Sequence, residues 1–263
     1  MIEKVLANKT ALVTGASSGL GVDFARQLAA RGANLVLVAR RQEQLCSVAA
    51  EIEKEYAVSA RPIVMDLAEP AAPQALYDAL KQVDAQVDVL VNNAGFGVFG
   101  NFVEIPWQRH QAMLDIDIIA LTHLTRLFLP DMLSRNFGYV LLVSSNGAYQ
   151  PTPTYAAYAA AKSYVLSMGE AINYELRGTG VSVTVISPGI TATEFLKVSG
   201  QPISLYQRAV RMDSPTVARI GIESMLRRRS SVVPGFINSL LAFSTRLVPR
   251  SLQAKLAYYS MNK

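Results

Sequence analysis

Cysteine is nearly absent from this chain: Cys46 is the only one among 263 residues. An internal disulfide needs two cysteines and a thiolate metal cluster needs more, so we expect neither kind of site. Proteins of oxidising compartments commonly carry several cysteines, whereas cytoplasmic proteins do not need them. The composition therefore favours a cytoplasmic protein.

Long apolar runs are absent as well. No stretch of 18 consecutive apolar residues occurs, so we expect no membrane-spanning helix. The first strand-like run lies at 10–14, which leaves no room for a signal peptide before it. The only histidines, His110 and His123, lack a neighbour at ligand spacing, so we expect packing or surface residues and predict no metal site.

Acidic residues are missing from one part of the chain. Residues 227–263 hold seven basic residues and no acidic one, whereas residues 1–226 hold 18 basic and 20 acidic residues. The sequence pI of about 9.3 therefore reports a basic C-terminal extension. It is no evidence for nucleic-acid binding.

Apolar residues are abundant, at 51% of the chain against 17% charged residues, which is typical of a globular protein. Short β-branched runs alternate with longer amphipathic segments. The runs that predict strands lie at 10–14, 34–39, 61–65, 87–91, 138–143 and 181–186, with a weaker one at 231–233. Helical patterns lie at 18–31, 42–56, 70–82, 106–135, 154–177, 215–228 and 236–248.

This alternation predicts an α/β fold. Strands that are apolar throughout must be covered on both faces, which indicates a parallel sheet between two layers of helices. We predict a single doubly wound, Rossmann-like domain over residues 1–263, with a mostly seven-stranded parallel sheet and an irregular piece at the C-terminus. Ligands of such sheets bind at the carboxyl ends of the strands, so the residues there form the candidate site.

Two of these strand ends have features of a dinucleotide site. Residues 15–21 form a glycine turn that opens a helix, whose N-terminus attracts a pyrophosphate, although glycine turns also serve geometry alone. Arg40 and Arg41 follow the second strand, where NAD-binding folds usually place an acid. A guanidinium binds the 2′-phosphate of NADP, so the sequence favours NADP, with Arg40 as the main contact, unless the arginines only cap a helix.

Tyr158 and Lys162 lie four residues apart on a predicted helix and therefore share one face. We expect the ammonium of Lys162 to lower the pKa of Tyr158 below its ordinary value of about 10. Tyr158 could then exchange a proton near neutral pH. Taken alone, such a pair more often belongs to an ordinary helix that carries a tyrosine and a solvated lysine.

Together these motifs resemble the short-chain dehydrogenase/reductase family over residues 9–195. The matching pieces are the turn at 14–21, Asp66-Leu67, Asn92-Asn93-Ala94-Gly95, Ser144-Ser145, Tyr158-x-x-x-Lys162, and Pro188-Gly189 with Thr193. Ser145 precedes Tyr158 by thirteen residues, as the catalytic serine of the family does. The combination in this order is far more specific than any single piece.

The resemblance implies hydride transfer between a nicotinamide and a carbonyl or alcohol. It implies that Tyr158 donates the proton, that Ser145 polarises the substrate oxygen, and that Lys162 also holds the nicotinamide ribose. The NADP(H) contacts that it implies, besides Arg40 and Arg41, are Gly15, Ser17, Ser18, Leu20, Gly21, Asp66, Leu67, Asn93, Ala94, Gly95, Tyr158, Lys162, Pro188, Gly189, Ile190 and Thr193.

The main departure from the family pattern is at position 117, and a milder one is Ala161, where the family often has a serine. The family usually has an asparagine where this chain has Asp117. The main-chain carbonyl at that position is thought to hold a water of the proton relay, and any residue supplies a carbonyl. An ionised Asp side chain accepts hydrogen bonds but cannot donate them. We therefore count Asp117 with the catalytic residues and expect the relay to survive with an altered pH dependence.

The segment 190–213 is expected to close over the substrate. Its apolar residues are Phe195, Leu196, Val198, Ile203, Leu205 and Tyr206, which favours an apolar carbonyl substrate. Arg208 and Arg211 leave a carboxylate or a carrier phosphate open. Tyr149 and Tyr155 flank the serine-to-tyrosine loop and either line the pocket or pack elsewhere.

The C-terminal extension, residues 227–263, combines arginines with apolar residues. The latter are Phe236, Leu240, Leu241, Phe243, Leu247 and Val248. The mixture suits an interfacial helix on an anionic membrane, a helix at a subunit interface, or a lid over the substrate mouth. The family resemblance also implies a homodimer or homotetramer paired through the helices at 106–135 and 154–177.

We therefore predict an NADPH-dependent reductase of an apolar ketone, aldehyde or 3-oxoacyl compound. One alternative is an NADP-dependent alcohol or hydroxysteroid-like dehydrogenase. An alternative of another class is a non-catalytic NADP(H)-binding sensor or scaffold. Retention of both Tyr158 and Lys162 argues against that last class.

Overall fold

The computed structural model describes residues 3–192, 195–201 and 211–262. Within them, seven strands form one parallel sheet in the order β3-β2-β1-β4-β5-β6-β7. The strands are β1 (Thr10–Thr14), β2 (Asn34–Ala39), β3 (Ala60–Val64), β4 (Val89–Asn92), β5 (Gly138–Val143), β6 (Val181–Ile186) and β7 (Ser231–Val232). The predicted seven-stranded parallel sheet is confirmed.

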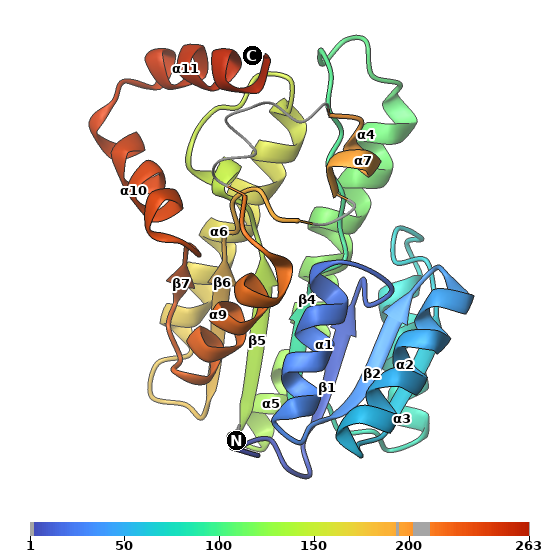
Figure 1. The fold of residues 1–263 in the computed structure, drawn as a ribbon. Helices are drawn as coiled ribbons and strands as arrows, with labels where there is room; N and C mark the ends of the chain where they lie inside the picture. Colours follow the sequence, from blue (N-terminus) through green and yellow to red (C-terminus); the bar gives the residue numbers. More distant parts are fainter. Residues whose placement is uncertain (1–2, 193–194, 202–210, 263) are drawn as a thin grey trace.

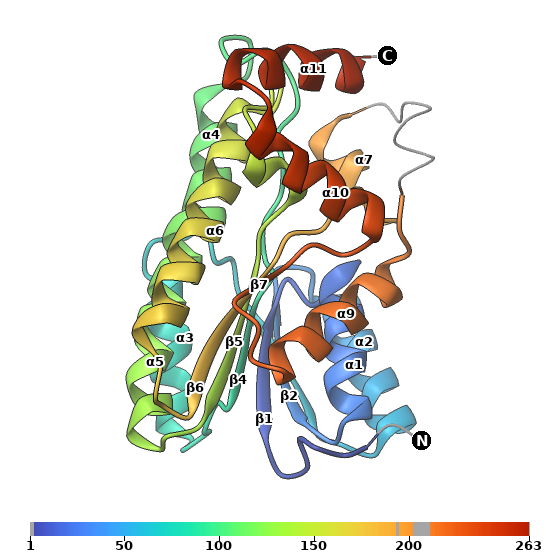
Figure 2. The same ribbon diagram turned by 90° about the vertical axis from the view of Figure 1, so that its left-hand side faces the viewer.

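Helices cover both faces of this sheet (Figures 1 and 2). One layer consists of α1 (Leu20–Ala30), α2 (Gln42–Tyr56) and α9 (Ser214–Leu226). The other consists of α3 (Ala72–Gln82), α4 (Trp107–Leu114), α5 (Leu121–Ser134) and α6 (Ala156–Glu175). The fold is therefore the doubly wound, Rossmann-like α/β fold that the alternation of strands and helices predicts.

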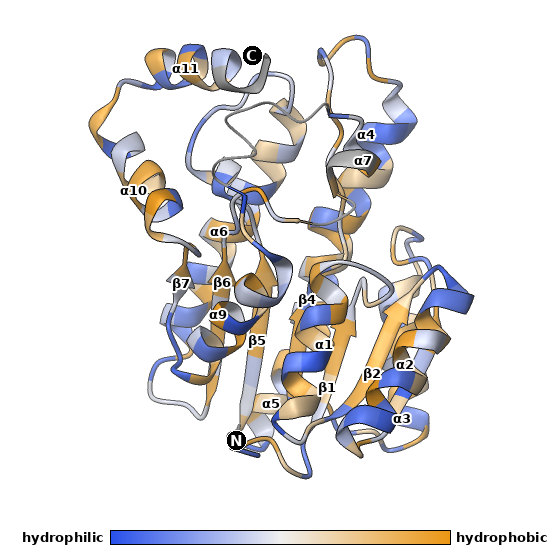
Figure 3. Ribbon diagram, viewed as in Figure 1, coloured by the Kyte–Doolittle hydropathy of each residue, from blue (hydrophilic) through white to orange (hydrophobic). Residues whose placement is uncertain are grey.

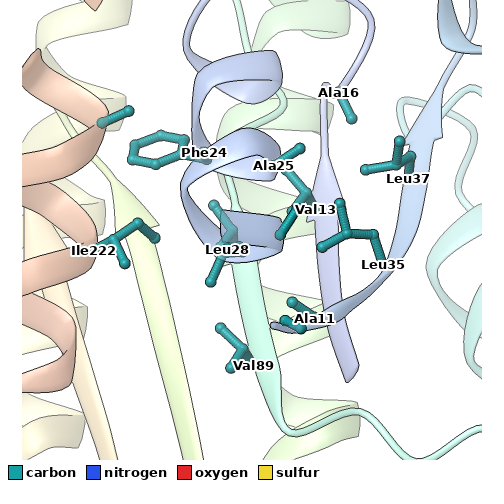
Figure 4. Close-up of a cluster of buried hydrophobic side chains, with 14 of the residues drawn as sticks. Ala11, Val13, Ala16, Phe24, Ala25, Leu28, Leu35, Leu37, Val89 and Ile222 are labelled. Atoms are coloured by element: carbon teal, nitrogen blue, oxygen red, sulfur yellow. The ribbon is translucent and has the colours of Figure 1, made fainter. Parts of the chain in front are cut away.

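The two layers explain why the strands are apolar throughout. Successive side chains of a strand point to opposite faces of the sheet. Ala11 and Val13 of β1 pack with Phe24 and Leu28 of α1 in one core cluster, shown in Figure 4, whereas Leu12 belongs to the cluster on the other face. Both faces of the central strands β1 and β4 bury their side chains, so a polar residue would be costly on either one, whereas the edge strand β3 leaves Arg61 and Val64 exposed.

The strand order places a switch point in the middle of the sheet. β1 pairs with β2 on one side and with β4 on the other. The chain therefore winds outward from β1 to β3 and then crosses back to continue from β4 in the opposite direction. At such a point the loops after the strands diverge and leave room for a ligand at their carboxyl ends.

The long helix predicted at 106–135 contains an irregularity. Between α4 and α5 the chain forms a π-helical turn, η1 (Asp115–Ala120). The helix axis continues, but the turn inserts one extra residue and changes which side chains face the sheet. Such turns occur frequently at functional sites. Hydrophobic periodicity does not reveal it because the flanking apolar pattern is helical on both sides.

The helix predicted at 236–248 is confirmed in its main part, whereas the irregular piece that the sequence predicts at the C-terminus is wrong. The chain there forms α10 (Phe236–Ser244), a short 3₁₀ turn η3 (Thr245–Leu247) and α11 (Arg250–Asn262). Pro249 breaks the pattern in the sequence, but proline is also common where a helix begins. These helices lie over the carboxyl ends of the strands (Figures 1 and 2). A short helix, α7 (Phe195–Ser199), was likewise not expected.

Within the described residues, none of the helices combines the length and the apolar character that crossing a membrane requires.

Candidate active site

A cavity of about 850 Å³ opens at the carboxyl ends of the central strands. Most of the predicted site residues line it: Gly15, Ser17, Ser18, Leu20, Arg40, Arg41, Asp66, Leu67, Asn93, Ala94, Gly95, Ser145, Tyr158, Lys162, Pro188, Gly189 and Ile190. Gly21 and Asp117 are not part of its wall. Thr193 lies outside the described residues.

The glycine turn forms one end of the cavity. Gly15 has φ +67°, and a Cβ atom there would approach Asn93 Nδ2 to 2.8 Å and the Cα atom of Ala94 to 2.9 Å. Only glycine fits this cradle without strain. The turn leads into α1, whose N-terminus has no side-chain cap. Amide groups at the N-terminus of a helix are suitable donors for an anion such as a pyrophosphate, and Gly19 and Leu20 at the start of α1 line the cavity.

Thr14 and Asn93 join the ends of β1 and β4. The hydroxyl of Thr14 accepts hydrogen bonds from the backbone amides of Asn93 (3.0 Å) and Ala94 (2.9 Å). The side-chain amide of Asn93 donates to the carbonyl of Thr14 (2.9 Å). Sequence reasoning assigned no role to Thr14, because a threonine at a strand end is not distinctive. These bonds set the separation of the two loops on which a dinucleotide would rest.

Two guanidinium groups stand at the end of β2. Arg40 Nη1 lies 3.3 Å from Asp66 Oδ2, in an ion pair that leaves the Arg40 side chain 64% exposed. Arg41 Nε donates to Ser17 Oγ at 3.3 Å. Arg40 thus contacts the loop after β3, and Arg41 contacts the glycine turn after β1. Both lie on the cavity wall, where a 2′-phosphate would meet positive charge.

Ser145, Tyr158 and Lys162 come together at the other end. Ser145 follows β5, and its hydroxyl accepts a hydrogen bond from the amide of Gly147 (3.2 Å). Ser144 Oγ donates to the carbonyl of Lys162 (2.7 Å), which fastens α6 to the end of β5. Lys162 Nζ donates to the carbonyl of Val143 (3.1 Å) and lies 5.7 Å from the centre of the Tyr158 ring. Tyr158 and Lys162 both line the cavity.

Asp117 contacts this group from behind the cavity. Its side chain is fully buried in the π-helical turn, and Oδ2 lies 3.4 Å from Lys162 Nζ. Oδ1 accepts a hydrogen bond from the amide of Phe96 (3.2 Å). A Cβ atom at Gly95 would overlap Asp117 Oδ1, so the close approach of the carboxylate requires a glycine there. Asp117 thus forms a buried ion pair with Lys162.

The ion pair changes the proton affinities of the site. Burial raises the pKa of Asp117 to about 6, although the charge of Lys162 and hydrogen bonds from Lys162 and Phe96 act to lower it. Burial, followed by the charge of Asp117, raises the pKa of Tyr158 above its ordinary value of 10.0, and a hydrogen bond with Ser145 opposes this shift. The expectation that Lys162 lowers the pKa of Tyr158 is therefore wrong. The charge of Lys162 is paired with Asp117, whose own charge acts on Tyr158 in the opposite direction.

Aromatic rings surround Tyr158 on the substrate side. The ring centroid of Tyr155 lies 5.6 Å from that of Tyr158, and the centroid of Phe195 lies 5.4 Å from it. The hydroxyl of Tyr155 is within hydrogen-bond distance of Ser199 Oγ (2.8 Å) and Gln201 Oε1 (2.9 Å). Tyr155 therefore lines the cavity, and Tyr149 does not. These contacts tie α7 to α6.

The segment 190–213 reaches the cavity in part. Phe195, Val198 and Gln201 contribute to the wall, in addition to Ile190 and Thr191. The predicted contributors Ile203, Leu205, Tyr206 and Arg208 lie outside the described residues. The role of this segment in closing over a substrate stays a prediction.

Sequence reasoning missed a wall of the cavity that the C-terminal helices supply. The residues are Asn238, Leu241, Ala242, Ser244, Thr245, Leu256 and Ala257. A Cβ atom at Gly189 would approach Asn238 Nδ2 to 2.6 Å, so α10 packs directly on the loop after β6. The apolar pattern at 236–248 was the available signal, and one of its three interpretations was a lid.

Comparison with known proteins agrees with this geometry. The family model for short chain dehydrogenase matches residues 9–203. A very-long-chain 3-oxoacyl-CoA reductase of Phaeosphaeria nodorum is 34% identical over 217 residues, which cover 80% of this chain and 63% of that protein. The chain thus matches less than two thirds of the length of that relative.

Two solved structures resemble the whole chain. One, from work on the stereoselectivity of a 7beta-hydroxysteroid dehydrogenase, has a TM-score of 0.87 and 26% identity and covers 98% of this chain and 99% of its own. The other is a short-chain dehydrogenase from Sphingobium yanoikuyae in complex with NADPH, with a TM-score of 0.81, 29% identity and coverage of 91% and 94%. The chain belongs to the short-chain dehydrogenase family, and it is an oxidoreductase of that family.

Proposed function

We propose that this protein is an NADPH-dependent reductase that transfers a hydride to an apolar carbonyl compound. The observation that carries the proposal is the meeting of Ser145, Tyr158 and Lys162 on the wall of the 850 Å³ cavity. A hydroxyl donor, a phenol and an ammonium converge there beside the loops that fit a dinucleotide. Membership of the short-chain dehydrogenase family supports the same chemistry.

The cavity fits NADP(H). The glycine cradle at Gly15 and the open N-terminus of α1 suit the pyrophosphate, and the two arginines after β2 suit the 2′-phosphate. Asp66 and Leu67 would contact the adenine, residues 93–95 the adjoining ribose, and residues 188–190 the nicotinamide amide. A similar structure was solved with NADPH. When bound, this cofactor supplies the hydride.

The protein's own residues handle the proton and the charge. Negative charge develops on the carbonyl oxygen as its carbon is reduced, and a hydrogen bond from Ser145 stabilises that charge. Tyr158 then donates its proton to the oxygen. Burial and the charge of Asp117 raise the pKa of Tyr158, so the phenol holds its proton at neutral pH, as a proton donor must. Lys162 contributes an ammonium that would bind the ribose hydroxyls, and Asp117 holds that ammonium in place.

The cavity wall supports an apolar substrate. Tyr155 and Phe195 face Tyr158, and Leu241 and Leu256 add aliphatic surface from the C-terminal helices. One relative is named for very-long-chain 3-oxoacyl-CoA reduction, so an apolar 3-oxoacyl compound is our first substrate class. The second candidate is the oxidation of a hydroxysteroid-like alcohol. The structure from the work on a 7beta-hydroxysteroid dehydrogenase, which covers 98% of this chain, favours it.

The test compares wild type and Tyr158→Phe in NADPH consumption with a panel of apolar ketones, aldehydes and 3-oxoacyl thioesters. Loss of the proton donor should lower kcat/KM about 10²- to 10⁴-fold. Tyr164→Phe is the matched control, because Tyr164 also lies on α6 but bonds with Thr122 outside the cavity. It should react like wild type.

Two results would overturn the proposal. Equal rates for wild type and Tyr158→Phe would remove Tyr158 from the reaction. NADPH binding without turnover of any panel member or of the corresponding alcohols would favour the sensor or scaffold alternative. The same assay run with NADH tests the cofactor, since equal use of both cofactors would contradict the role given to Arg40 and Arg41.

A further inference from the structure

The C-terminal arm, defined here as residues 236–262, carries an apolar stripe on its outer face. Phe236, Leu240, Phe243 and Leu247 follow one another at spacings of four and three residues along α10 and η3. Their exposed fractions are 83%, 56%, 55% and 75%. The spacing puts them on one side of the helix, opposite the buried Asn238 and Ala242. Figure 3 shows the apolar character of α10.

The second helix of the arm repeats this pattern. Leu252, Leu256 and Tyr259 of α11 stand at the same spacings of four and three, with exposed fractions of 45%, 56% and 52%. Single exposed apolar residues are normal on a protein surface, but consecutive helices that each expose a stripe indicate an interaction site. The arm therefore presents an exposed apolar stripe on each of two consecutive helices, which favours an apolar partner.

Every charged residue in the described part of the arm is basic: Arg246, Arg250 and Lys255. The guanidinium of Arg246 lies 6.0 Å from the centre of the Phe243 ring, at the edge of the stripe. Two copies of this chain that met face to face through the arm would bring these like charges together. An anionic lipid surface offers apolar chains to the stripe and phosphates to the basic residues. Charge complementarity thus selects the membrane as the occupant.

The inner face of the same arm belongs to the cavity wall. Leu241 and Ala242 of α10 and Ala257 of α11 line the cavity, and Asn238 packs on Gly189. Leu256 both lines the cavity and is 56% exposed, so it marks the rim. A membrane bound to the outer face would therefore lie beside the mouth of the cavity.

We propose that the C-terminal arm docks this protein on an anionic membrane surface, with its apolar stripes among the acyl chains and its basic residues on the phosphates. The cavity then takes up a lipophilic substrate from the bilayer. The docking step stands on the arm alone. The uptake step rests on the proposed function.

The test is flotation of the purified full-length protein with vesicles, without cofactor or substrate. Wild type should float with vesicles of equal parts phosphatidylcholine and phosphatidylglycerol at low salt. It should not float with vesicles of phosphatidylcholine alone, and high salt should release it from the anionic vesicles. Arg246→Gln/Arg250→Gln should weaken binding about 25-fold, or roughly fivefold for each charge. Leu240→Ser/Phe243→Ser should weaken it as well.

Matched control variants remove charged or apolar side chains of the same kind from exposed positions outside the arm. Lys54→Gln/Arg61→Gln removes two exposed charges from the α2–β3 region, and Val103→Ser removes a side chain that is 90% exposed. Both should bind like wild type. Circular dichroism and NADPH binding verify the fold of each variant, and the charge variant keeps the test valid if the serine variant fails to fold.

The docking proposal is overturned if wild type does not bind anionic vesicles at low salt, or if the arm variants bind them as well as wild type does. Sedimentation velocity adds a further outcome. If the arm variants convert an oligomer to a smaller species and wild type binds no vesicles, a second copy covers the arm and the proposal is wrong. Because no turnover is measured, failure here leaves the reductase proposal standing, and the reverse also holds.

Discussion

At the scale of single residues, the buried pair of Asp117 and Lys162 distinguishes this site. An ammonium with no partner would be costly in a closed pocket, and the carboxylate offsets that cost. The pairing also weakens the influence of Lys162 on Tyr158, whose pKa is raised and not lowered. An asparagine at position 117 would leave the lysine uncompensated, so the aspartate alters the proton chemistry without removing a catalytic group.

Asp117→Asn is therefore predicted to shift the pH dependence of turnover. Carbonyl reduction fails when pH rises through the pKa of Tyr158, because a phenolate has no proton to give. Removing the charge of Asp117 lowers that pKa, so the fall in kcat/KM should move to lower pH in the variant. Wild type should also show a change near pH 6, where Asp117 takes up a proton, and the variant should lack it.

Asp115→Asn is the matched control for this pH profile. Asp115 lies in the same π-helical turn and is not part of the cavity wall or of the pair with Lys162. Its profile should coincide with that of wild type. A profile of Asp117→Asn that coincides with wild type would mean that the buried charge does not act on Tyr158.

The residues that sequence could predict are those with a distinctive spacing. Tyr158 and Lys162 are four residues apart on a helix, and the structure places both on the cavity wall. Arg40 and Arg41 follow a strand at a place that local order defines. Thr14 and Asn238 could not be predicted, because each acts through a contact with a residue far away in the chain. The direction of the pKa shift of Tyr158 could not be predicted either, because it depends on burial and on the charge of Asp117.

At the scale of elements, the π-helical turn between α4 and α5 positions the buried carboxylate. It places Asp117 beside Lys162 of α6 and the amide of Phe96 after β4. Strands were predicted within one or two residues because their apolar runs are short and bounded by polar loops. The π turn and α11 were not predicted, since neither changes the local hydrophobic pattern in a way that separates it from a helix or an irregular end.

Gly95→Ala should test this arrangement. The new methyl group would overlap Asp117 Oδ1 and lie 3.4 Å from Lys162 Nζ, so the pair must shift. We expect a loss of about 1–3 kcal/mol in the free energy of unfolding, which is typical of overpacking, together with a lower kcat. Urea unfolding and steady-state kinetics measure the two effects.

Gly178→Ala is the control for Gly95→Ala, because it separates the effect of backbone strain from that of a steric contact. Gly178 has φ +83°, and a methyl group on its Cα would meet no atom of the described residues within 4 Å. Alanine there adds backbone strain of about 1 kcal/mol without a steric contact. Its kcat should equal that of wild type. If Gly95→Ala also leaves kcat unchanged, the position of Asp117 has no part in turnover.

At the scale of the whole molecule, the order of strands and helices was sufficient to predict the sheet and the edge at which the cavity opens. That succeeds because an apolar strand must be covered on both faces and because parallel strands end at one edge. The arm over the cavity could not be predicted, since its place depends on contacts between α10 and the loop after β6. That residues 1–263 form one domain stays a prediction.

The central claim is that a hydride passes from NADPH to an apolar carbonyl in this cavity. The most direct measurement uses NADPH deuterated at C4 of the nicotinamide, on each face in turn, with mass spectrometry of the alcohol formed. We predict that one of the two labelled forms transfers one deuterium to the carbinol carbon and that the other transfers none. An alcohol without deuterium from either form, or no alcohol at all, would contradict the claim.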